Sequence, residues 1–167
     1  MHAIKAIISA TESSHASIGE KVFLLRRIDL FSALCNAELY HLANLMDTLN
    51  LDTNQRLIQE GDLDRDVYFL RSGSMRVEMN GQQIEVLNAG AIIGEMSAVD
   101  ALPRSASITA TEPSSVYRLN AKHFLGGEFD LDYDKAYRAI ERRVAKPLGL
   151  SVMDAALGIL KLADVKM

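Results

Sequence analysis

The sequence predicts a mainly-β fold of the α+β class, in which an antiparallel sandwich or rolled barrel of short strands lies between helical segments. Three observations predict it. Residues 48–119 form short runs that alternate apolar and polar positions, with turn residues between them. Asn80-Gly81 separates two of these runs and favours a tight hairpin, because both turn residues must accept positive φ. The flanking residues, 1–47 and 120–167, repeat apolar side chains at helical spacing.

The N-terminal segment, residues 1–47, is predicted to be helical. Its last helix should begin at Asn36, because an asparagine side chain can accept a bond from a free N–H of the first turn. Leu39 and Leu42 then recur at helical spacing. Within the strand region, residues 48–119, strands are expected at 67–70, 75–79, 83–87, 107–111 and 115–119.

The C-terminal segment, residues 120–167, is predicted to be helical again. We expect a hinge at Asn120–Leu125 and then a longer helix over 132–146, on which Ala136 and Ile140 share a face. Pro147 ends that helix or lies just beyond it. The apolar residues 151–162 either pair with a second copy of the chain or pack back on the domain.

Charge and composition exclude several classes of function. The chain has 167 residues and a formal net charge of -4, which argues against a general nucleic-acid surface. A single cysteine, Cys35, excludes an internal disulfide and fits a reducing compartment. No apolar run approaches the roughly 18 residues of a membrane helix. We therefore expect a cytoplasmic protein that binds no nucleic acid and does not enter a membrane.

The residues richest in chemistry form two neighbouring runs, Gly94-Glu95-Met96-Ser97-Ala98 and Pro103-Arg104-Ser105-Ala106-Ser107. A carboxylate can accept a bond from a ribose hydroxyl, and a guanidinium can hold a phosphate through two parallel bonds. Small residues let backbone N–H groups approach an anion closely. Together these residue types favour a pocket for a sugar phosphate.

This pattern resembles the phosphate-binding cassette of cyclic nucleotide-binding domains, the family of the catabolite activator and of protein kinase A regulatory subunits. The resemblance covers about residues 28–146 and includes Glu60-Gly61-Asp62. It departs mildly at Asp29, where the family usually has proline, and at Ile92 or Ile93, where it has an aromatic residue. The resemblance implies a jelly-roll-like antiparallel β-roll over 48–119, flanked by N-terminal helices and by C-terminal hinge and lid helices.

The resemblance also implies a ligand, cAMP or cGMP, and a role for each residue of the cassette 94–107. Glu95 would accept from the ribose 2′-hydroxyl, and Arg104 and Ser105 would bind the cyclic phosphate. The expected ligand-binding residues are Gly94, Glu95, Met96, Ser97, Arg104, Ser105 and Ala106, although Ser97 is as well explained by packing. Val77, Ile84 and Leu87 would line the base. Tyr137, Arg138 or Glu141 would cover it, and the residues do not choose between adenine and guanine.

Other interpretations stay open or are set aside. Glu95 and Arg104 could form a structural ion pair, and the domain could be a degenerate, ligand-free form that serves protein–protein assembly. The acidic runs 62–66 and 130–134 lack the glycine that a calcium loop requires at its sixth position. No metal site, cofactor or catalytic motif is expected, so the chain should not be an enzyme. Expected partners are a second copy bound through the C-terminal helices, or a larger signalling or transport protein.

Overall fold

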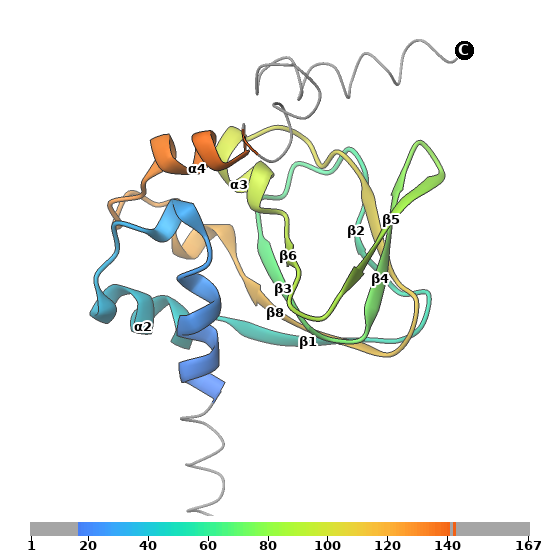
Figure 1. Ribbon diagram of the computed structural model, residues 1–167, viewed down its shortest axis with the longest axis horizontal. Coiled ribbons are helices and arrows are strands. Elements are labelled where there is room, and N and C mark those ends of the chain that lie inside the picture. Colours follow the sequence, from blue (N-terminus) through green and yellow to red (C-terminus); the bar gives the residue numbers. More distant parts are fainter. Residues whose placement is uncertain (1–16, 141, 143–167) are drawn as a thin grey trace, which may run out of the picture.

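The computed structural model describes residues 17–140 and 142. Its strands form two four-stranded antiparallel sheets, in the orders β1-β8-β3-β6 and β2-β7-β4-β5, which face each other as a roll (Figure 1). The strands are β1 Asp47–Leu51, β2 Arg56–Ile58, β3 Val67–Ser72, β4 Ser74–Met79, β5 Gln82–Asn88, β6 Ile92–Ile93, β7 Ser107–Ala110 and β8 Ser114–Leu119. The predicted mainly-β roll is confirmed. The sequence pattern missed the separate strands β1, β2 and β6.

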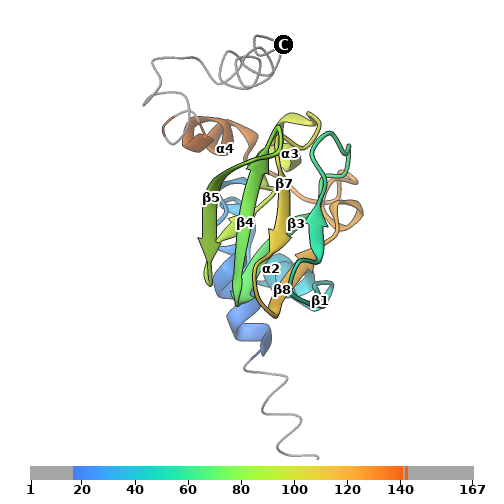
Figure 2. The same ribbon diagram turned by 90° about the vertical axis from the view of Figure 1, so that its right-hand side faces the viewer.

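The hairpin predicted at Asn80-Gly81 is confirmed. It joins β4 to β5, with φ values of 52° at Asn80 and 74° at Gly81. Positive φ at both central residues is the geometry of the tight turn whose twist matches the flanking strands. Figure 2 shows β5 beside β4 and β4 beside β7, so this hairpin forms one wall of the roll and leaves β5 at its edge.

The described helical elements are residues 17–25, η1 Asp29–Phe31, α2 Asn36–Asn44, α3 Glu95–Asp100, η2 Ala121–His123 and α4 Tyr133–Ile140. The expected cap at Asn36 was wrong by one residue. Cys35 is the N-cap, and its backbone N–H donates to the Glu38 carboxylate at 2.8 Å. Asn36 is the first helical residue, and its side-chain oxygen accepts instead from Arg26.

Two apolar cores stabilise this arrangement. One lies between the sheets and contains Leu70, Met75 and Val116. The other lies between the β3–β8 sheet and the helices, where the Phe31 and Phe124 rings meet edge to face at 5.4 Å. Burying such aromatic side chains supplies roughly 2–3 kcal/mol each. The second core therefore fixes the helices around η1 and η2 against the roll.

Helices α3 and α4 lie at the same end of the roll (Figures 1 and 2). Just ahead of α4, the backbone N–H of Asp132 donates to the carbonyl of Leu30 at 2.9 Å, and within α4 Lys135 pairs with Asp29 at 3.6 Å. In the described part of the chain, every helix is too short or too polar to cross a membrane. The end of the helix expected over 132–146 and the apolar run 151–162 lie outside the described residues.

Candidate functional site

A cavity of about 520 Å³ opens between the β4–β5 hairpin and the α3 end of the roll. Its size falls in the range of small-molecule sites in proteins. Its lining residues are Ile58, Val77, Glu85, Leu87, Ile92, Gly94, Glu95, Met96, Ser97, Arg104, Ser105, Ala106 and Ile108. The structure thus brings all seven predicted cassette residues to one cavity.

Gly94 allows the cassette to fold tightly at the start of α3. Its φ is +86°, a conformation that side-chain-bearing residues rarely adopt. A Cβ on Gly94 would lie 2.6 Å from the carbonyl oxygen of Asp66 and would also overlap Nη1 of Arg104. The missing side chain is therefore required both by the backbone and by the closeness of Arg104. Gly94 is the N-cap residue of α3, which runs over Glu95–Asp100.

Arg104 is buried, with 4% of its surface exposed, and its guanidinium is held by oxygen acceptors. The Asp64 carboxylate accepts from Nε at 3.0 Å and also from Nη2, as a two-pronged ion pair. Nη2 also donates to the carbonyl of Asp66 at 2.6 Å, and Nη1 donates to the carbonyl of Gly94 at 3.3 Å. These bonds use four of the five N–H groups of the guanidinium.

The carboxylate that accepts from the Arg104 guanidinium thus belongs to Asp64, forty residues away in the chain. Burial acts to raise the pKa of Asp64, but the hydrogen bond and charge of Arg104 outweigh it and hold the pKa below its usual value. Tyr68 lies beneath the guanidinium, with its ring centre 6.0 Å from Cζ of Arg104. Burial, with the charges of Asp64 and Asp66, raises the pKa of Tyr68 to about 12, so its hydroxyl stays neutral.

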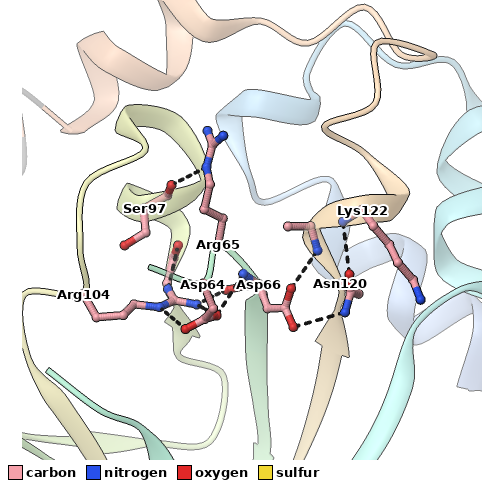
Figure 3. Close-up of polar contacts among 9 residues, drawn as sticks. Asp64, Arg65, Asp66, Ser97, Arg104, Asn120 and Lys122 are labelled. Atoms are coloured by element: carbon pink, nitrogen blue, oxygen red, sulfur yellow. Dashed lines mark hydrogen bonds and ion pairs between the residues drawn. The ribbon is translucent and has the colours of Figure 1, made fainter. Parts of the chain in front are cut away.

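The three residues Asp64, Arg65 and Asp66 connect the cassette to the hinge (Figure 3). Arg65 donates to the carbonyls of Ser97 at 2.9 Å and Ala98 at 2.6 Å, and these bonds stabilise the C-terminal part of α3. Such a contact opposes the partial negative charge of a helix C-terminus.

The third residue of this segment reaches the hinge. The Asp66 carboxylate accepts from the backbone N–H of Ala121 at 2.8 Å and from the Asn120 side chain at 3.4 Å, at the start of η2 (Figure 3). Its own backbone carbonyl accepts from Arg104. Asp66 therefore touches the buried arginine with its main chain and the hinge with its side chain.

The remaining cassette residues differ in exposure. Glu95 and Ser97 are buried, each 7% exposed, while Ser105 is exposed at the mouth of the cavity and Ala106 is half-buried. Glu95 lies in the first turn of α3, and its side chain lines the same cavity as Arg104.

The wall predicted for the base is only partly as expected. Val77 and Leu87 line the cavity, but Ile84 does not and is 57% exposed. A bulge between β4 and β5 explains this: Val77 pairs with Glu85 and Glu78 pairs with Gln83, which leaves Ile84 without an opposite residue. Glu85, which lies opposite Val77 and is exposed, lines the cavity instead.

Sequence reasoning missed Glu85 and the segment 64–66. Strand periodicity carried a signal for Glu85, because Ile84 and Leu87 are three residues apart and a regular strand places them on opposite faces. No local pattern pairs Asp64 with Arg104. Of the three expected base-covering residues, Arg138 is exposed and lies 3.9 Å from Asp134. The Tyr137 side chain and Glu141 lie outside the described part.

Comparison with known proteins shows what this chain is similar to. A family model described as the cyclic nucleotide-binding domain matches residues 48–126. The cAMP-dependent protein kinase type II regulatory subunit of Drosophila melanogaster is 34% identical over 92 residues, which are 53% of this chain and 24% of that protein. The cGMP-dependent protein kinase of Toxoplasma gondii is 31% identical over 99 residues, which are 59% of this chain and 10% of that protein. The chain thus matches about a quarter or less of these relatives.

The fold is also that of a solved relative. The regulatory domain of Toxoplasma gondii protein kinase A, crystallised with cAMP, superposes with a TM-score of 0.62 at 21% identity, over 84% of this chain and 56% of that one. At this identity the likeness concerns the fold alone. Residues 48–126, which contain the whole cassette, thus match the family of cyclic nucleotide-binding domains.

Proposed function

We propose that this domain is a non-enzymatic sensor that binds cAMP or cGMP and transmits occupancy to its C-terminal helices. One observation carries the proposal: all seven predicted cassette residues line one cavity, with a buried arginine among them. The names of the kinase relatives support a cyclic nucleotide as the ligand class. The cavity also holds both chemistries that such a ligand needs, a cation for the phosphate and a carboxylate for the ribose.

Arg104 would bind the cyclic phosphate. One Nη1–H is left over by its four internal bonds, so a phosphate oxygen can accept it without any displacement. A second, parallel bond requires the guanidinium to give up the carbonyl of Gly94 or of Asp66, both uncharged acceptors. A phosphate is the stronger acceptor, because it carries a negative charge that attracts the guanidinium, whereas the carbonyl oxygens are uncharged. Ser105, exposed beside Arg104, would add its hydroxyl.

Glu95 would accept a bond from the ribose 2′-hydroxyl. Glu95 is buried in the first turn of α3, follows Gly94 in the sequence and lines the cavity. The 2′-hydroxyl is the only hydroxyl of a 3′,5′-cyclic nucleotide, because the other ribose oxygens are esterified or in the ring. This contact would therefore fix the sugar relative to the phosphate.

Occupancy would reach the hinge through the segment 64–66. A phosphate that draws Arg104 toward the cavity would change its bonds to Asp64 and to the Asp66 carbonyl, and the Asp66 carboxylate holds the start of η2. The hinge at η2 and the helical segment from α4 onward would then close toward the base. A ligand shifts such an equilibrium only by its difference in affinity for the two arrangements. The moving helices are the expected surface for a second copy or a larger signalling or transport protein.

The test is calorimetric titration of the purified chain with cAMP and with cGMP, for the wild type, Arg104→Lys and Arg118→Lys. Arg104→Lys keeps the positive charge but loses the planar guanidinium that can donate two parallel bonds. We therefore expect the affinity for the cyclic nucleotide to fall about tenfold to a hundredfold. Arg118→Lys is the matched control, because Arg118 also pairs with a carboxylate, that of Asp47, but does not line the cavity.

Saturable binding that is weakened by Arg104→Lys and not by Arg118→Lys would support the sensor. Absence of binding by wild type that has been unfolded and refolded, to remove any bound nucleotide, would refute it. That result would favour the degenerate, ligand-free domain, in which the ion pair between Arg104 and Asp64 serves stability alone.

A further inference from the structure

The unexpected residue of the cavity is Glu85. It stands on the edge strand β5, opposite Val77, and it lines the cavity with Leu87. Its two apolar neighbours in sequence, Ile84 and Val86, are 57% and 45% exposed. A half-buried strand normally turns its apolar residues inward and its charges outward. On β5 all three of these residues are exposed, and Glu85 is the one that lines the cavity, because the bulge at Ile84 sets which residue lies opposite Val77.

The surroundings of Glu85 leave its carboxylate uncommitted. Within the described part of the chain, no hydrogen bond or ion pair engages it. The wall around it is apolar, with Val77, Leu87 and Ile58 among its residues. Glu85 is exposed, so its carboxylate is free to meet a ligand, and the exposure of its apolar neighbours Ile84 and Val86 is the kind of local conflict that functional positions show.

Ligand chemistry then limits what Glu85 can meet. An ionised carboxylate accepts hydrogen bonds and donates none. A 3′,5′-cyclic nucleotide donates from two places only: the ribose 2′-hydroxyl, which the proposed function assigns to Glu95, and the N–H groups of the base. Arg104, the one cation among the described lining residues, is bound to Asp64 and faces the phosphate. The base is thus the remaining donor for the second carboxylate.

We propose that Glu85 reads the base, accepting a hydrogen bond from a purine N–H group that faces β5. The inference rests on the proposed function. Two purine edges have this chemistry: the 6-amino group of adenine, and the N1–H with the 2-amino group of guanine. A carboxylate is repelled by the 6-oxo group of guanine, so the site distinguishes bases by which of these edges it faces. A site built to accept from an N–H group rejects analogues that lack it.

The experiment titrates the full chain with the cyclic monophosphates of adenosine, guanosine and inosine. Inosine has the 6-oxo group and N1–H but no amino group, so it serves as the reference for both amino contacts. The variants are Glu85→Gln and Glu85→Ala. Glu78→Gln is the control, because Glu78 lies on the same hairpin, pairs with Arg76 at 3.1 Å and does not line the cavity. Thermal unfolding of each variant checks that the fold is unchanged.

We expect Glu85→Ala to weaken one amino-bearing nucleotide about fivefold to tenfold more than the inosine reference, with a smaller loss for Glu85→Gln. A selective loss for the adenosine ligand identifies the 6-amino group, and a selective loss for the guanosine ligand identifies the 2-amino group. Equal effects on all three ligands, including no effect, would overturn the role of Glu85 and leave the sensor intact. Failure of wild type to bind any of the three would overturn both proposals.

Discussion

The replacement of Gly94 by alanine tests how tightly the cassette is built. The change adds one methyl group at a φ of +86°, where a non-glycine residue costs about 1–2 kcal/mol. The new Cβ would also lie 2.6 Å from the Asp66 carbonyl oxygen, a backbone atom that cannot swing away. Overpacking of this kind costs about 1–3 kcal/mol more. The total expected loss in the free energy of unfolding is therefore about 2–5 kcal/mol.

Gly90→Ala is the matched control. Gly90 has nearly the same backbone conformation, with φ at +94°, but an added Cβ meets nothing within 4 Å. It should lose only the backbone cost of about 1–2 kcal/mol. For a chain of this length, each kcal/mol lowers Tm by roughly 2–4 °C. We thus expect Tm to fall about 4–20 °C for Gly94→Ala and about 2–8 °C for Gly90→Ala.

Thermal and denaturant unfolding measure the stability of both variants, and calorimetry measures their affinity for cAMP and cGMP. Because the added methyl group also overlaps Nη1 of Arg104, Gly94→Ala should lose binding, and Gly90→Ala should retain it. Equal losses of stability in the two variants would show that backbone conformation alone matters at Gly94. Full binding by Gly94→Ala would refute the close approach of Gly94 to Arg104.

Two further predictions concern the segment 64–66. Asp64→Asn should lower the free energy of unfolding by about 1 kcal/mol near neutral pH, a small value because the Asp64 side chain is 41% exposed. Folding lowers the pKa of Asp64 from 3.8, so its contribution to the free energy of unfolding is present above that value and is lost as pH falls through the folded-state pKa. Denaturant unfolding curves of wild type and variant should therefore converge at more acidic pH. Asp66→Ala should keep the bond from Arg104 to the backbone carbonyl of residue 66 and remove the side-chain bond to the Ala121 N–H. We therefore expect ligand affinity to change little. Hydrogen exchange of the Ala121 amide should become faster and should no longer respond to ligand. Asp62→Ala, in the same run but outside these contacts, is the control, and slow exchange at Ala121 in Asp66→Ala would contradict the coupling.

Local signals made much of the fold predictable. The Asn80-Gly81 turn and the alternation on either side fix the β4–β5 hairpin, because turn conformation and strand periodicity are properties of neighbouring residues. Short strands are harder to predict. β6 consists only of Ile92–Ile93, and two residues are too few to show a period. These residues form a strand because their backbone pairs with that of β3.

The gathering of Gly94 through Ala106 at one cavity could be expected, since these residues lie close together in sequence and their pattern resembles a known motif. The contacts that organise it were not. Asp64 reaches Arg104 across forty residues, and no spacing in the sequence predicts that pair. Which β5 residue lines the cavity depends on which β4 residue lies opposite it. The bulge is therefore set by pairing between the two strands and cannot be predicted from the sequence of β5 alone.

The ion pair between Asp64 and Arg104 has a consequence for the concentration range in which the domain responds. When full engagement of a ligand requires Arg104 to loosen its internal bonds, the apparent Kd is the intrinsic Kd divided by the fraction of molecules in which it is already loosened. Asp64 would bias that fraction indirectly from outside the cavity lining, because it holds Nε and Nη2 of Arg104 while the bonds that a phosphate displaces go to the carbonyls of Gly94 or Asp66. Substitutions at Asp64 would therefore move the threshold of response up or down and leave the shape of the cavity, and with it the choice of ligand, unaltered.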